Sequence, residues 1–87
     1  MELRLEDCHS LKEKRHTVQS LKERLRNKHN VAVAEVEYQD LWQRAAVACV
    51  TVSPDRVHAE KVLRAVEDDA ASLLGPALAA AEVEWLA

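Results

Sequence analysis

Two helix-patterned segments, each set between segments with the alternation of β-strands, most constrain the fold of this chain. The first helix signal is at Ser10, which forms a capping box with Glu13 and so satisfies free backbone amides at a helix start. Apolar residues at helical spacing follow on one narrow stripe, namely Leu11, Val18, Leu21 and Leu25. We expect this helix to end between Asn27 and Asn30, where Asn and His replace strong helix formers.

The second helix signal begins at Ser53. Ser53 is placed as the cap, Pro54 at the first helical position and Asp55 as an acid in the first turn. A moderately amphipathic pattern continues to about Leu74, and Gly75-Pro76 predicts its end.

Short β-patterned segments stand at both ends of the chain. Leu3 and Leu5 alternate with charged residues and predict a short, half-buried first strand, along which the chain begins partway. Val83 and Trp85 alternate with glutamates and predict the last strand.

Two further β-patterned segments lie between the helices. Residues 31–38 alternate, but the apolar phase slips by one residue, which predicts a bulge or a strand that reaches past the sheet edge. Residues 44–52 are apolar on both faces, as in a central strand or one whose outer face is covered.

The resulting order is βαββαβ. Two right-handed βαβ crossovers with a hairpin between them predict a ferredoxin-like α+β sandwich, a four-stranded antiparallel sheet with two helices on one face. Residues 1–87 are expected to form one domain. Its core is built mostly from Ala, Val and Leu without any Phe, so we expect a marginally stable monomer or a homodimer.

The first helix is strongly basic in an acidic chain. Between Ser10 and His29 seven Lys and Arg stand against two acids, about +5, whereas the whole chain carries −3. At 100° per residue, four of these cations line a stripe that flanks the apolar one: Lys12, Arg15, Lys22 and Arg26. The stripe is either an ordinary solvated helix face or a surface that follows a phosphate backbone.

Two motifs carry a resemblance to a known family. Residues 9–15 (HSLKEKR) and 34–45 (AEVEYQDLWQRA) resemble the YlxP-like family of small bacterial proteins, over nearly the whole chain. The family is of unknown function, and the resemblance implies a ferredoxin-like fold with a longer first strand. Its genes often lie beside those of transcription and translation factors, which implies a role near the ribosome or its RNA.

Both motifs contain residues that allow two interpretations. The angle of Lys14 falls inside the apolar stripe, so we expect its stem to pack and its amine to reach solvent; alternatively it faces a carboxylate such as Asp40. Trp42 either closes the core at the end of the sheet or anchors a partner or a second copy. Asp40 and Arg44 are placed for a local ion pair at the same interface.

Catalytic and cofactor signals are weak. Cys8 and His9 are neighbours that rarely face each other, Cys49 reads as core filler, and the four His show no metal-ligand spacing, so we expect no enzyme, metal or cofactor. The single Gly excludes a glycine-rich phosphate loop. Without a membrane-length apolar run, and with two distant Cys, we expect a cytoplasmic protein.

We therefore expect a non-enzymatic binding module. The first interpretation is RNA or a ribosomal component bound by Lys12, Arg15, Lys22, Arg26 and Lys14. The second is a protein-interaction or dimerisation module that uses the open sheet face and the Trp42 loop.

Overall fold

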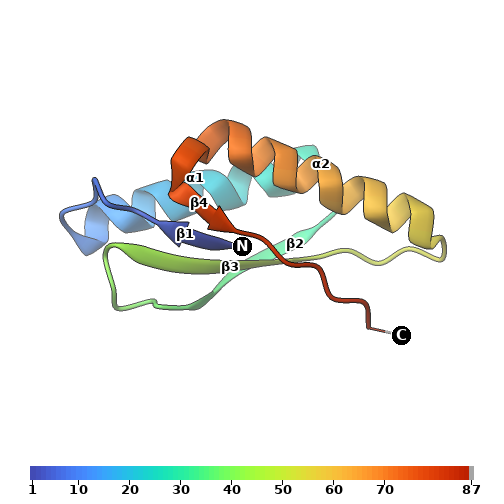
Figure 1. The fold of residues 1–87 in the computed structure, drawn as a ribbon, viewed down its shortest axis with the longest axis horizontal. Coiled ribbons are helices and arrows are strands. Elements are labelled where there is room, and N and C mark those ends of the chain that lie inside the picture. Colours follow the sequence, from blue (N-terminus) through green and yellow to red (C-terminus); the bar gives the residue numbers. More distant parts are fainter. Residues whose placement is uncertain (87) are drawn as a thin grey trace.

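The computed structural model of the chain describes residues 1–86 and shows the predicted βαββαβ order. The elements are β1 (Glu2–Arg4), α1 (Leu11–Lys28), β2 (Ala32–Glu37), β3 (Arg44–Val50), α2 (Arg56–Leu74), a 3-10 turn (Gly75–Ala77) and β4 (Leu78–Ala80). All neighbouring strands are antiparallel in the order β2-β3-β1-β4. Both helices lie on one face of this sheet (Figure 1). The predicted ferredoxin-like α+β fold is thus confirmed.

Helix α1 begins with the predicted capping box. The Glu13 backbone N–H donates to Ser10 Oγ at 3.1 Å. In return, the Glu13 carboxylate accepts the backbone N–H of His9 at 2.7 Å, one residue ahead of the cap. Two amides at the helix start are satisfied in this way, which fixes where α1 leaves the turn after β1.

Helix α2 begins two residues later than predicted. Asp55 is the cap, because its Oδ1 accepts the Val57 N–H at 3.0 Å, whereas Ser53 Oγ accepts the Asp55 N–H at 3.1 Å. Ser and Asp are both good helix caps. Here the side chain of Ser53 forms a turn that precedes the helix, and this turn places Asp55 at the cap position. At the other end, Gly75 takes a φ of 58°, which glycine adopts without steric cost, and ends α2 as predicted.

The predicted bulge in the second strand is confirmed. Glu35 pairs with Val47 and Glu37 with Ala46, so Val36 is an extra residue in β2. A bulge of this kind re-aims the side chains on either side of it. As a result, Glu35 faces the helices although Glu37, two residues later, lies opposite a residue of the open face.

The predicted last strand is wrong in position. β4 is Leu78–Ala80, and Val83 and Trp85 lie in a segment without strand pairing. The reason is the register, in which Ala80 pairs with Glu2 and later residues pass the beginning of β1. An alternating pattern forms a strand only where a neighbouring backbone accepts its hydrogen bonds.

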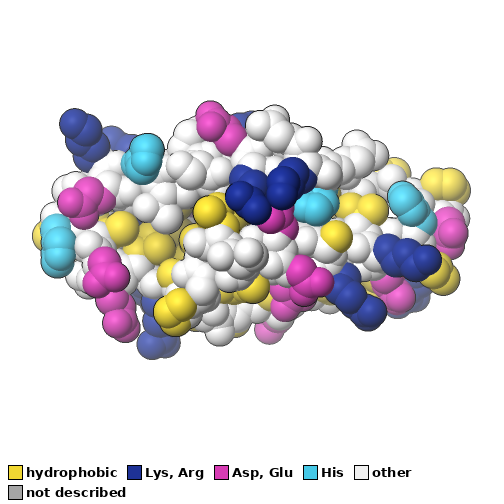
Figure 2. Space-filling view, turned by 90° about the horizontal axis from the view of Figure 1, so that it is seen from above, with side chains coloured by type: hydrophobic (Ala, Val, Ile, Leu, Met, Phe, Trp, Pro, Cys, Tyr) yellow, Lys and Arg dark blue, Asp and Glu magenta, His cyan; other side chains and the backbone are white. Residues whose placement is uncertain are grey.

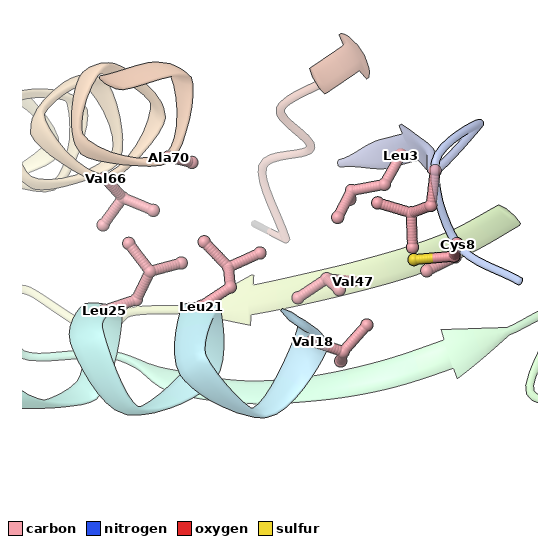
Figure 3. Packing of buried hydrophobic residues seen from close by; sticks show 10 residues of the cluster. Leu3, Cys8, Val18, Leu21, Leu25, Val47, Val66 and Ala70 are labelled. Atoms are coloured by element: carbon pink, nitrogen blue, oxygen red, sulfur yellow. The ribbon is translucent and has the colours of Figure 1, made fainter. Parts of the chain in front are cut away.

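The core lies between the helices and the sheet. Figure 3 shows side chains of α1 pointing toward Val47 of β3 and toward Val66 and Ala70 of α2. Most of the core residues are small, but Leu3, Leu21 and Leu25 are almost completely buried. Deleting a buried Leu side chain in such a core costs about 2–5 kcal/mol.

An acidic residue of α2 joins the two helices. Asp69 receives a hydrogen bond from Arg24 Nε at 2.8 Å and lies 3.2 Å from His29 Nε2 and 3.9 Å from Lys28 Nζ. The hydrogen bond from Arg24 is the main reason that the pKa of the Asp69 carboxyl is lowered, against desolvation, which raises it. The ionised carboxylate is therefore favoured by the fold.

This cluster predicts a contribution to stability that disappears in acid. A lowered folded pKa stabilises the protein above the unfolded pKa of about 4 and loses its effect as the pH falls through the folded value. We expect Asp69→Asn to lower the urea midpoint at pH 7, with the difference from the unmodified chain shrinking as the pH falls below about 4. Asp68→Asn, at the exposed neighbouring position, is the control. Equal effects of the two changes at pH 7 would contradict the assignment.

Candidate functional site

The two sequence motifs meet at a buried ammonium group. Lys14 of α1 is 1% exposed, and its Nζ lies 3.0 Å from Glu35 Oε2. It also donates a hydrogen bond to the backbone carbonyl of Tyr38. The expectation that the amine reaches solvent is wrong, and the alternative of a carboxylate partner is correct in kind, with Glu35 in place of Asp40. Because it is buried, Lys14 also drops out of the predicted RNA-binding set.

The local structure on each side prepares this contact. Glu35 is the last inward-facing residue before the bulge, and its Oε2 has no other partner among residues 1–86. Tyr38 takes a left-handed φ of 62°, uncommon for a residue with a side chain, as the chain leaves β2. A buried cation needs a close counter-charge and hydrogen-bond acceptors, and the two β2-side groups supply them.

A second cation holds the same loop from outside. The Arg44 guanidinium stacks over the Tyr38 ring, 4.1 Å from its centroid, and donates to Tyr38 Oη at 3.1 Å. No ion pair joins Asp40 to Arg44 within the described part of the chain, so that predicted pair is wrong. Arg44 contacts the aromatic ring instead, an attraction between a cation and the negative face of a π-system.

The loop between β2 and β3 presents two large apolar side chains to solvent. Leu41 and Trp42 are each 47% exposed, so the interpretation of Trp42 as the closure of the core is wrong. The backbone beside them is fixed, because Leu41 N–H donates to the Tyr38 carbonyl at 3.0 Å and Leu5 N–H to the Gln43 carbonyl at 2.9 Å. A held loop with an exposed Trp and Leu has the composition of a partner anchor.

The bases of α1 divide into two groups. Three of them are paired with acids of other elements: Lys14 with Glu35, and Arg24 and Lys28 with Asp69. The remaining four are those of the predicted stripe, and none of them has an acidic partner within residues 1–86: Lys12, Arg15, Lys22 and Arg26. Three of the four are exposed and Lys22 is half-buried. The four residues of the stripe therefore carry the positive charge of α1 that no acid within residues 1–86 pairs with.

The stripe is narrow rather than part of a broad basic face. Figure 2 looks from above onto the helix side of the molecule, and Lys and Arg are interspersed there with Asp, Glu and His. The helix-side surface in this view is thus mixed in charge. Any attraction for an anion would come from the row along α1 and not from the net field of the protein, which is acidic.

The geometry offers no catalytic constellation in the part that the structure describes. Cys8 is buried in the core while the His9 side chain is exposed, and Cys49 is half-buried with a pKa raised mainly by that burial. No three His, Cys, Asp or Glu side chains of residues 1–86 converge on a point where a metal ion could be held. Neither of the two helices described is both long and apolar enough to cross a bilayer.

Comparison with known proteins gives the family. Residues 1–83 match the family described as "Protein of unknown function (DUF503)". The chain belongs to this family. It is also 45% identical over 60 residues to the uncharacterized protein YlxP of Bacillus subtilis (strain 168), a match that covers 69% of this chain and 65% of the relative. The predicted membership of the YlxP-like family is confirmed, and the match spans just under two thirds of the length of that relative.

Two residues of the site escaped the sequence analysis. Glu35 and Tyr38 were not assigned to Lys14, although the sequence contains a signal for one of them. Glu35 shares its strand face with Val31 and Val33, which places a carboxylate on the inward face, just as the angle of Lys14 places a cation there. A cation and a carboxylate that project from two facing apolar surfaces are expected to form a pair, because burying either one alone is unfavourable. The Tyr38 carbonyl carried no comparable signal.

The buried ion pair predicts a large asymmetry between single and double substitutions. Lys14→Met leaves Glu35 without its counter-charge, and breaking a buried pair in this way costs about 3–5 kcal/mol of unfolding free energy. Adding Glu35→Leu removes the stranded carboxylate and should restore most of the loss. Urea unfolding of the unmodified chain, the single variant and the double variant measures both values. Lys12→Met is the exposed control, and a Lys14→Met effect no larger than this control would disprove the role.

Proposed function

We propose that this protein is a non-enzymatic, cytoplasmic binding module that engages RNA or a ribosomal component through α1. The observation that carries the proposal is the row of four cations without acidic partners among residues 1–86, on a helix whose other bases are paired internally. Cations aligned along one helix edge release counterions when they contact successive phosphates, which favours binding without a specific base.

The proposal implies weak dependence on nucleotide sequence. Domains of the same βαββαβ order that recognise RNA through stacking carry aromatic residues on their central strands. The central strands β1 and β3 contain none. Recognition through α1 therefore depends on backbone charge and on the shape of the RNA rather than on its base edges.

Salt dependence tests this proposal. If the row neutralises about three or four phosphates, the logarithm of affinity for a short single-stranded RNA falls against the logarithm of salt with a slope of about −2 to −3. Lys22→Glu with Arg26→Glu should remove most of that slope. Lys61→Glu with Arg64→Glu, two exposed positions of α2, makes the same change in net charge away from the row. The proposal fails if no binding is measured even at about 50 mM salt, or if both pairs act alike.

The exposed loop residues favour a second candidate, a protein-interaction or homodimerisation module. Leu41 and Trp42 stand out from a loop that Lys14 and Arg44 hold in place. The open sheet face adds a flat area of small apolar side chains, where Ala32 pairs with Val50 and Ala34 with Ala48. Preordered apolar anchors of this kind give up little conformational entropy on binding.

Mass and affinity measurements separate the two candidates. If the loop joins two copies, Trp42→Ala should lower the molar mass measured by light scattering while the salt slope for RNA stays unchanged. Trp85→Ala, which removes a similarly exposed Trp outside the loop, is the matched control and should leave the mass as it is. An unmodified protein that is monomeric at all concentrations would exclude the dimer interface.

A further inference from the structure

Two arginines lie side by side on the sheet face that the helices leave open. Arg4 of β1 is the partner of Arg44 of β3 in the register of these antiparallel strands. Their strand neighbours Leu3 and Ala45 belong to the core and are each 1% exposed. Because side chains alternate along a strand, Arg4 and Arg44 point away from the helices. Figure 1 shows that β1 ends and β3 begins at the same end of the sheet, beside the loop between β2 and β3.

The hydrogen-bonding pattern brings the two arginines especially close. The Leu5 N–H donates to the Gln43 carbonyl at 2.9 Å, so these two residues form a hydrogen-bonded pair. In antiparallel strands such pairs alternate with non-hydrogen-bonded pairs, and the adjacent pair of Arg4 and Arg44 is therefore non-hydrogen-bonded. Pairs of that kind have their Cα atoms about 4.5 Å apart, the shorter of the two spacings.

The two positive charges lack a counter-charge. Neither Arg4 nor Arg44 has a carboxylate in ion-pair contact within residues 1–86. Both side chains are exposed. Like charges directly opposite each other on neighbouring strands weaken a sheet. An anion placed between the two guanidinium groups would turn this repulsion into two attractive contacts.

Arg44 is already held in position for such a contact. Its guanidinium lies 4.1 Å from the centroid of the Tyr38 ring and donates to Tyr38 Oη at 3.1 Å. Tyr38 is itself anchored, because its backbone carbonyl accepts a hydrogen bond from the buried Lys14. A guanidinium carries five N–H donors, and the contact with Tyr38 uses one of them. A planar fork that is held in this way matches the oxygens of a phosphate and loses little freedom on binding it.

An exposed indole lies close to the arginine pair. Trp42 is 47% exposed and comes two residues before Arg44, a length of chain that spans at most about 7 Å. The backbone between them is fixed by the hydrogen bond from Leu5 to Gln43. An aromatic side chain of this kind provides a surface on which any nucleic-acid base can stack. A nucleotide joins its phosphate to its base through a single sugar, so Arg44 and Trp42 are placed to contact both parts of one nucleotide.

We propose that this end of the open sheet face binds a single-stranded nucleic acid, with one phosphate between Arg4 and Arg44 and a neighbouring base stacked on Trp42. All three side chains are exposed, so the site is flat. Small-molecule sites are concave and bury most of their ligand, and a flat site therefore fits a strand better than a free nucleotide.

The site is separate from the row of cations along α1, and so goes beyond the contact proposed for that helix. Both helices cover the other face of the sheet (Figure 1). Towards the middle of the open face, Glu2 and Glu37 lie on either side of Ala46 in the register and repel a phosphate there. The strand is therefore held at the loop end of the sheet.

The fluorescence of Trp42 gives the first test. Trp85→Phe leaves Trp42 as the only tryptophan of the chain. Titration with a single-stranded oligoadenylate of about six nucleotides should quench its emission to saturation. Adenosine monophosphate and a strand of the same length without bases should each bind about tenfold or more weakly. Equal affinity for either of them would overturn the proposal, as would binding of the oligoadenylate without quenching, or no binding at all.

Substitution of Arg4 gives the second test and separates this site from α1. In the Trp85→Phe background, Arg4→Gln should weaken oligoadenylate binding about tenfold, whereas the urea midpoint should stay the same or rise because a like-charge contact is removed. Arg64→Gln, at an exposed position of α2, is the matched control for the change in charge. Lys22→Glu with Arg26→Glu should leave the quenching at saturation unchanged. If Arg4→Gln binds as tightly as the Arg64→Gln control, the site is refuted while the proposal for α1 stands.

Discussion

The buried ammonium of Lys14 is the interaction on which the candidate site depends. It lies within the apolar stripe of α1 and has two partners from β2 and its exit, the Glu35 carboxylate and the Tyr38 carbonyl. Desolvating a cation and a carboxylate together is tolerated only when both are held close, so the contact requires one position of α1 against β2. The same contact fixes the backbone that presents Leu41 and Trp42. Helix, bulge and exposed loop are therefore parts of one arrangement.

The distribution of charge follows from this arrangement. A helix with seven bases suggests a uniform cationic surface, yet three of the seven are used to hold α1 against β2 and α2. What remains is a row along one edge, on a protein whose overall charge is negative. Screening confines the field of such a row to about 10 Å at 0.1 M salt, so an anionic group of any kind must come close to the row before it is attracted.

Structural features that depend on neighbouring residues could be predicted from the sequence, whereas features that depend on a residue far along the chain could not. The capping box at Ser10, the end of α2 at Gly75 and the bulge in β2 each depend on a few neighbouring residues, and all three are confirmed. The exposure of Trp42 depended on how far the loop stands out from the sheet, which no local pattern records. The partner of Lys14 depended on an inward carboxylate 21 positions away.

The last strand also shows that a local pattern is not enough when a distant partner is required. Val83 and Trp85 alternate with acids as a half-buried strand does, and the alternation is a real property of the segment. A strand, however, needs a neighbouring backbone to accept and donate its hydrogen bonds. The register of β4 places Val83 and Trp85 beyond Glu2, where β1 begins. Local pattern therefore gives the capacity to form a strand, and the length of the neighbouring strand decides whether that capacity is used. The length of β1 therefore limits β4, whereas β3 extends past β1 to Val50 because β2 pairs with it there.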